Sequence, residues 1–194
     1  RLSDLEPEHV SAYCLKIEEG TPFGKTAGRP ELPGEDEVAE MYLGTIEFLA
    51  GSGFYQYEIS NFARPGYECR HNIKYWSCDE YLGFGASAHS CFGGERFACP
   101  ASLERFCRGE YVDKASRIKL TDADLETEYV MLTMRRTTGL VAGEYARRFG
   151  SDPHKKYDAR FREFMDLGLV IADDSGYRFT PRGMLVSNSV LSSV

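Results

Sequence analysis

One short segment of this 194-residue chain carries the side chains best suited to bind a metal-bearing ligand. They form an HNxxYW run made of His71, Asn72, Tyr75 and Trp76. An imidazole can ligate iron through a ring nitrogen, and neighbouring aromatic rings can face a planar macrocycle. The run therefore predicts binding of a planar iron compound such as heme, with His71 as the metal ligand. A structural alternative stays open, in which Tyr75 and Trp76 are half-buried aromatics and His71 caps a turn.

A second block, YLGFGASAHS from Tyr81 to Ser90, is rich in small residues. Its apolar character predicts a strand, and Gly83 and Gly85 would let another molecule approach the backbone closely. Relief of crowding at a sheet bend explains these glycines equally well.

Four blocks in order along nearly the whole chain carry a resemblance to a known family. They are HVSAYCLKIEEGTPF (9–23), YEISNFARPGYECRHNIKYW (57–76), YLGFGASAHS (81–90) and a C-terminal pattern with FREFMDLGLV and TPRGMLVSNSV. The chain resembles the HemW group, which are heme chaperones similar to oxygen-independent coproporphyrinogen III oxidases of the radical SAM superfamily. In that group the HNxxYW run is associated with heme binding. The resemblance thus implies a protein that binds heme and delivers it to heme-accepting proteins.

The resemblance also implies a site for S-adenosylmethionine at the mouth of an incomplete barrel. It places Tyr13, Gly83, Gly85 and His89 toward this cofactor in the full-length protein. The open alternative is that Tyr13 and His89 are core residues with satisfied hydrogen bonds.

The family's CxxxCxxC motif, whose thiolates hold a [4Fe-4S] cluster, is absent from this sequence. The six cysteines are Cys14, Cys69, Cys78, Cys91, Cys99 and Cys107, and no two are closer than eight positions. Such spacings are not those of iron-sulfur or zinc sites, so no cysteine is predicted to be a metal ligand. Because the chain opens at Arg1 without an initiator methionine, we expect it to be the C-terminal portion of a longer protein. Radical chemistry by this portion alone is not expected.

Composition is that of a soluble globular protein, with 42% hydrophobic and 27% charged residues. No signal peptide or membrane span is visible, and the scattered cysteines suit a reducing compartment, so we expect a cytoplasmic protein. Residues 113–194 contain 13 basic and 12 acidic side chains, which leaves 10 basic and 18 acidic ones, a net charge of −8, for residues 1–112. This acidic part should repel a phosphate backbone, which argues against nucleic acid as a partner.

The sequence pattern of residues 1–112 predicts an α/β domain. Strands are predicted over 10–17, 54–59 and 81–90, and a helix of about 16 residues follows Pro33-Gly34. The order strand, helix, strand, loop, strand predicts parallel construction. By resemblance, this domain is the C-terminal part of an incomplete (β/α) radical-SAM barrel.

Residues 113–194 read as a separate α+β domain. Helices are predicted from Thr121, over 142–149 and over 157–167, followed by strands over 169–172 and 177–180 and a terminal helix within 181–191. Three helices and a hairpin resemble a winged helix, with a linker near residues 107–119.

Two other functions compete with the heme chaperone. One is oxygen-independent coproporphyrinogen III oxidase, and the other is a winged-helix nucleic-acid-binding module whose third helix carries Lys155, Lys156, Arg160 and Arg162. The HNxxYW run argues against the oxidase, and the acidic residues among these cations argue against the module. We further expect that a heme acceptor could be membrane-associated. An exposed half-barrel could also make this portion dimerise.

Overall fold

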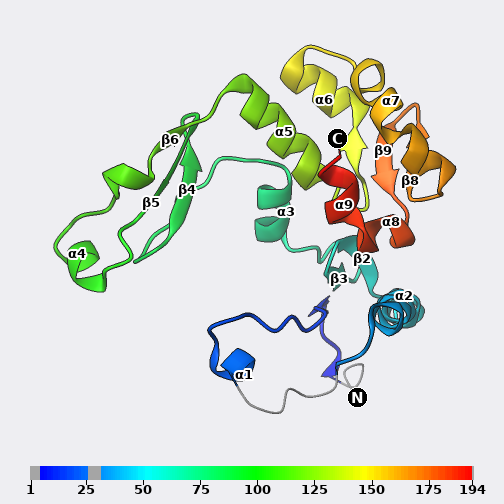
Figure 1. Cartoon of the computed structure of the whole chain (residues 1–194), viewed down its shortest axis with the longest axis horizontal. Coiled ribbons are helices and arrows are strands. Elements are labelled where there is room, and N and C mark those ends of the chain that lie inside the picture. Colours follow the sequence, from blue (N-terminus) through cyan, green and yellow to red (C-terminus); the bar gives the residue numbers. More distant parts are fainter. Residues whose placement is uncertain (1–4, 26–31, 194) are drawn as a thin grey trace. The chain divides into compact units, whose positions relative to one another are not determined.

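The computed structural model describes residues 5–25 and 32–193, and the chain forms two compact units (Figure 1). The first unit comprises Arg1–Cys69 and Met134–Val194, and the second comprises Arg70–Thr133. Within the described residues, the first unit holds two three-stranded sheets and the second unit holds one.

The first sheet of the first unit is antiparallel. Its strands are β1 (His9–Ser11), β2 (Tyr55–Glu58) and β3 (Asn61–Ala63), with β3 in the middle. Phe62 lies opposite Val10 on one side and opposite Gln56 on the other. The parallel arrangement predicted from the sequence is therefore wrong for these strands. A two-residue connection at 59–60 joins β2 to β3, and so short a connection can only join antiparallel strands.

The strand predicted over 10–17 is confirmed only at its start. After β1 the backbone N–H of Ala12 still donates to the carbonyl of Ser60 at 2.9 Å, and the chain then leaves the sheet. Tyr13 and Leu15 beyond it are 72% and 65% exposed. Their apolar pattern is typical of a strand, but this segment has no strand partner within the described residues.

Helix α2 (Glu35–Gly51) confirms the helix predicted after Pro33-Gly34, and a short α1 (Pro22–Lys25) precedes it. A carboxylate oxygen of Glu37 accepts a hydrogen bond from the Gly34 backbone N–H at 2.9 Å. Three acidic residues in the first turn suit the positive end of the helix dipole. Near its other end, Leu49 packs with Phe54 and Phe62 in a core where each is at most 5% exposed.

The second unit is built on another antiparallel sheet. Its elements are α3 (Arg70–Trp76), β4 (His89–Phe92), β5 (Glu95–Ala98), α4 (Leu103–Cys107), a 3-10 turn (Lys114–Ser116), β6 (Ile118–Lys119) and α5 (Asp122–Thr133). Strand β5 is central, and the β4–β5 hairpin turns at Gly93 and Gly94, where φ is +62° and +73°. Positive φ at both central residues is what a tight two-residue hairpin needs, and it favours glycine.

The strand predicted over Tyr81–Ser90 is wrong for most of its length. Tyr81 makes a single bridge to Cys91, and regular pairing begins only at His89. Between them φ is +123° at Gly85 and +62° at Ser87, which no continuous strand accommodates. The small residues in this block therefore build a turn that folds back on β4.

The C-terminal part of the first unit follows the sequence prediction closely. Its elements are β7 (Leu140–Val141), α6 (Ala142–Phe149), α7 (Pro153–Asp166), β8 (Val170–Asp173), β9 (Gly176–Phe179), α8 (Pro181–Leu185) and α9 (Ser187–Leu191). Gly150 ends α6 in a left-handed conformation, and the Asp152 side chain caps α7. The predicted hairpin is confirmed in sheet order β7-β9-β8, whereas the single predicted terminal helix is two short helices.

The order α5, β7, α6, α7, β8, β9 contains the three helices and the hairpin that the sequence predicted. The winged-helix description, the incomplete barrel and the boundary between residues 112 and 113 stay predictions.

The contribution of Asp173, in the β8–β9 turn, to the stability of the protein is expected to depend on pH. The Ser175 hydroxyl and the Arg178 guanidinium donate to its carboxylate, and these hydrogen bonds, with the Ser175 backbone N–H at 2.9 Å, hold the pKa of Asp173 at about 2. Because the folded pKa lies below the ordinary 3.8, the contribution of Asp173 to stability is present above pH 3.8 and is lost as the pH falls toward about 2.

We expect NMR titration of the Asp173 carboxyl carbon to give a midpoint near 2. Ser175→Ala should raise that midpoint, whereas Asp174→Asn, a matched change in the same turn, should leave it low. A midpoint near 4 in the unmodified protein would contradict the role of these donors.

Candidate functional site

The HNxxYW run lies on α3, a helix where the sequence predicted a loop between strands. A turn at Gly66, where φ is +87°, leads the chain toward the helix. Cys78 ends it in a left-handed conformation with φ +54°, and its backbone N–H donates to the carbonyl of Tyr75 at 3.1 Å. The helix places His71 and Tyr75 four positions apart, and therefore on the same face.

The rings of α3 form a row that starts at an exposed imidazole. His71 is exposed, and its ring lies 4.8 Å from that of Tyr75 at an interplanar angle of 90°. Tyr75 in turn lies 4.6 Å from the ring of Tyr81 at 75°. Asn72 and Trp76 are half-buried, whereas Tyr75 is 37% exposed. The structure thus brings the rings of His71 and Tyr75 into contact on one face of α3.

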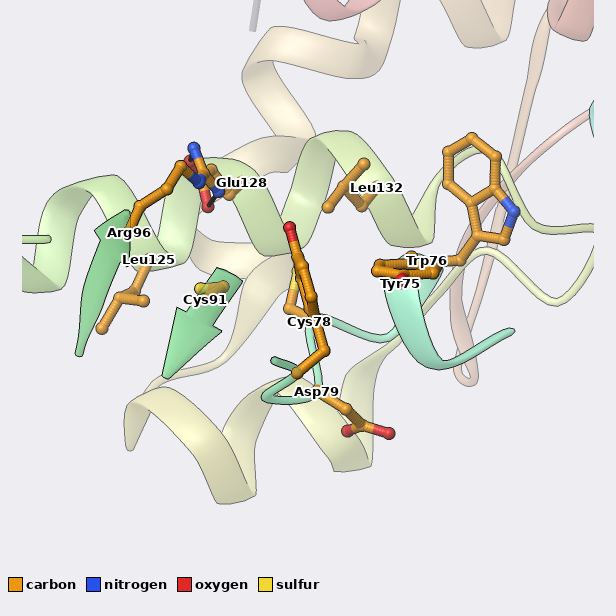
Figure 2. A pocket seen from close by; sticks show the side chains of 10 residues that line it. Tyr75, Trp76, Cys78, Asp79, Cys91, Arg96, Leu125, Glu128 and Leu132 are labelled. Carbon is orange, nitrogen blue, oxygen red and sulfur yellow. Dashed lines mark hydrogen bonds and ion pairs between the residues drawn. The ribbon is translucent and has the colours of Figure 1, made fainter. Parts of the chain in front are cut away.

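Tyr75 and Trp76 also line a pocket of about 300 Å³ within the second unit (Figure 2). The pocket is bounded by α3, the turn after it, β4, β5 and α5. Its lining residues are Tyr75, Trp76, Cys78, Asp79, Tyr81, Cys91, Arg96, Leu125, Glu128 and Leu132. Most of this lining is aromatic, aliphatic or thiol, which suits an apolar ligand surface.

A paired charge closes one end of the pocket. The Arg96 guanidinium donates two hydrogen bonds of 2.8 Å to the two carboxylate oxygens of Glu128, and Figure 2 shows these side chains meeting. Donation to Glu128 raises the pKa of Arg96, and burial raises the pKa of the Tyr81 phenol. Arg96 is therefore already engaged with a carboxylate, and the Tyr81 hydroxyl is neutral at physiological pH.

The fold of the second unit favours glycine at both position 83 and position 85. A Cβ on Gly83 would lie 2.2 Å from the His89 carbonyl oxygen, and Gly85 has φ +123°. The Gly83 backbone N–H also donates to the buried Ser90 hydroxyl at 3.0 Å. The surface that comes close to Gly83 thus includes the chain's own β4, whereas a Cβ on Gly85 would meet no atom within 4 Å. Their proposed contact with S-adenosylmethionine stays a prediction.

Tyr13 belongs to the first unit, whereas Gly83, Gly85 and His89 belong to the second. Tyr13 and His89 are both exposed, which argues against the alternative that they are core residues. Tyr13 lines a separate apolar pocket of about 370 Å³ with Tyr42 and Phe62 among others. The grouping of these four residues around one cofactor stays a prediction.

Several pocket residues were not singled out from the sequence. Tyr81 lies in a block that was noted for its glycines, and Cys78 and Cys91 have no ligand-like spacing. Arg96 and Glu128 are 32 positions apart, and no local pattern connects them. Only the approach of β5 to α5 reveals this pair.

Among the described residues, no cluster of three or more His, Cys, Asp or Glu side chains could hold a metal ion. The six cysteines form no disulfide there. None of the described helices has the length and apolar character needed to cross a bilayer.

Comparison with known proteins identifies the family. Residues 120–186 match the HemN C-terminal domain. Over 97% of its length the chain is 31% identical to the heme chaperone HemW of Bacillus subtilis, and over 96% it is 30% identical to that of Lactococcus lactis. The chain is HemW-like over nearly its whole length. It spans about half the length of these relatives, 51% of the first HemW protein and 50% of the second. The family resemblance drawn from the four sequence blocks is therefore confirmed.

The HemW-type chain also has the fold of a solved structure. Coproporphyrinogen III oxidase (HemN) from Escherichia coli, described as a radical SAM enzyme, aligns with a TM-score of 0.71 over 99% of this chain and 49% of HemN. The sequence identity is 20%, so this likeness concerns the fold alone. It confirms the mixed α and β class predicted from the sequence.

Proposed function

We propose that this chain is the heme-binding portion of a heme chaperone, with heme as a cargo passed to heme-accepting proteins. The observation that carries the proposal is the exposed His71 imidazole on α3, in ring contact with Tyr75 beside an apolar pocket. An exposed imidazole suits a carrier, because the bound iron stays accessible to an acceptor. The names of the HemW relatives agree with this function.

Each residue of the run has a role in this proposal. His71 ligates the heme iron through a ring nitrogen, and Tyr75 and Trp76 pack against the macrocycle. Asn72 is half-buried on the same helix and contributes a polar side chain to the site. Ligation at one axial position leaves the opposite face of the iron for an acceptor's ligand.

We further propose that Tyr13, Gly83, Gly85 and His89 face S-adenosylmethionine in the full-length protein. The relationship to radical SAM proteins supports a cofactor of this kind together with an iron-sulfur cluster, for which [4Fe-4S] is the expected type. This chain's sequence lacks the CxxxCxxC ligands, so no chemical step is assigned to it.

The remaining proposals concern the compartment of the protein, its partners and its oligomeric state. We propose a cytoplasmic protein that meets heme-accepting proteins, including a membrane-associated acceptor. Dimerisation is proposed on the exposed apolar side chains of the first unit, such as Tyr13, Leu15 and Phe48 at 65% exposure or more. The oxidase function is not adopted, because the likeness to HemN is one of fold and the HNxxYW run favours heme.

Titration of the protein with hemin tests the proposal. We expect a saturable shift of the Soret band at one heme per chain, and transfer of that heme to added apomyoglobin. Iron-free protoporphyrin IX should bind more weakly, because it offers His71 no metal. Hemin that leaves the Soret band of free hemin unchanged would reject the heme-binding role.

A further inference from the structure

The pocket beside α3 has the size and polarity to decide how a bound heme is oriented, and this inference rests on the proposed function. Heme carries propionate carboxylates on one edge and methyl and vinyl groups on the opposite edge. We propose that the vinyl edge enters the pocket lined by Tyr75, Tyr81, Cys91 and Leu132, while the propionates stay outside it.

The position of Tyr75 connects the iron ligand with the pocket. The centroid of its ring lies 4.8 Å from that of His71 and 4.6 Å from that of Tyr81, and Tyr75 also lines the pocket. An axial Fe–N bond lies in the plane of the imidazole, so a macrocycle bound to His71 stands perpendicular to that ring. The Tyr75 ring, at 90° to His71, is therefore one that can lie parallel to the macrocycle.

The charges of the pocket exclude a carboxylate. Arg96 already shares two hydrogen bonds with Glu128, and Asp79 adds a negative charge at the rim. Figure 2 shows the Asp79 carboxylate pointing away from the other side chains of the pocket. A propionate that entered would have to displace Glu128 or remain unpaired next to it, and both outcomes are costly. Methyl and vinyl groups meet no such cost.

Cations for the propionates lie on α3 outside the pocket lining. Arg70 and Lys74 are both exposed, four positions apart on the helix that carries His71. Exposed cations of this kind pair with carboxylates at a small desolvation cost, because both groups stay largely hydrated. The pocket volume, about 300 Å³, lies at the lower limit for sites that enclose a drug-sized ligand. It accommodates one edge of the macrocycle and leaves the rest open to an acceptor.

The first test compares hemin with deuterohemin, in which hydrogen replaces both vinyl groups, on the unmodified protein. We expect deuterohemin to bind roughly tenfold more weakly by Soret titration, because the pocket then buries fewer apolar carbons. For each heme, the Soret band of the protein complex is compared with that of the same heme bound to free imidazole. The difference should be equal for the two hemes, since His71 ligates both. Equal dissociation constants for the two hemes would overturn the proposal.

The second test fills the pocket with Leu132→Trp, matched by Thr127→Trp, which adds the same side chain at an exposed position of α5 outside the lining. Far-UV circular dichroism checks that both variants fold. We expect Leu132→Trp to weaken hemin binding about tenfold with the Soret position kept, and Thr127→Trp to bind like the unmodified protein. Equal affinity in the two variants would overturn the pocket assignment but leave His71 as ligand. Absence of any hemin binding to the unmodified protein would instead reject the proposed function.

Discussion

His71→Ala is expected to abolish the Soret shift that hemin produces with the unmodified protein. The imidazole is the proposed iron ligand, and its ring is exposed, so the substitution removes a ligand without opening a cavity. Loss of a group that merely supports a metal ligand already costs roughly 10- to 100-fold in affinity, so loss of the ligand itself should cost more than about 100-fold. Hemin titration of the variant, followed at the Soret band, measures this effect.

His154→Gln is the matched control, because it removes a different imidazole in the other compact unit. It should bind hemin like the unmodified protein. Far-UV circular dichroism of both variants should show unchanged helix content. If His71→Ala kept the Soret band of the unmodified complex, the iron ligand would have to be sought at His89, His9 or a cysteine.

Gly176→Ala should strongly destabilise the sheet formed by β7, β8 and β9. Gly176 begins β9 with φ +131°, and a Cβ there would lie 1.9 Å from the backbone oxygen of Leu140 on β7. An alanine therefore has to adopt a strained conformation and also separate β7 from β9. The pairing at stake includes Leu140 opposite Tyr177, two side chains that are at most 1% exposed. Strain and overpacking together should cost on the order of 3–4 kcal/mol.

Thermal unfolding followed by circular dichroism should place the midpoint of Gly176→Ala roughly 10 °C below that of the unmodified protein. Gly143→Ala is the matched control, since a Cβ on this glycine of α6 meets no atom within 4 Å. Alanine there should raise stability by roughly 0.5–1 kcal/mol, because it is a better helix former than glycine. Equal unfolding midpoints for the two variants would contradict this prediction, because they would show that β7 can move away from position 176 at no cost in stability.

Local signals in the sequence account for most of the correct fold predictions. Helix α6 and its end at Gly150, the β8–β9 hairpin and α2 all follow from residues within or next to the element itself. Failures occurred where distant pairing decided the outcome. The apolar segment after β1 has no strand partner in the described residues, and two positive φ values turn the Tyr81–Ser90 block out of a strand.

In the candidate site, too, some features could be predicted from local sequence, whereas others depend on contacts between distant segments. His71 and Tyr75 could be proposed from their types and spacing, although the helix that puts them on one face was not predicted. Tyr81 joins their ring row only because the turn after α3 folds back. No spacing in the sequence predicts the contact of Arg96 with Glu128, which depends on the packing of β5 near α5.

The amino-acid sequence by itself determined the family and the HNxxYW run, because both are properties of residue order. It also determined those helices and turns whose caps and glycines act within a few positions. Only the tertiary structure decided the antiparallel sheets, the pocket beside α3 and the charge pair that closes it. Each of these depends on contacts between segments far apart in the chain, and such contacts form through burial and backbone pairing that no local pattern encodes.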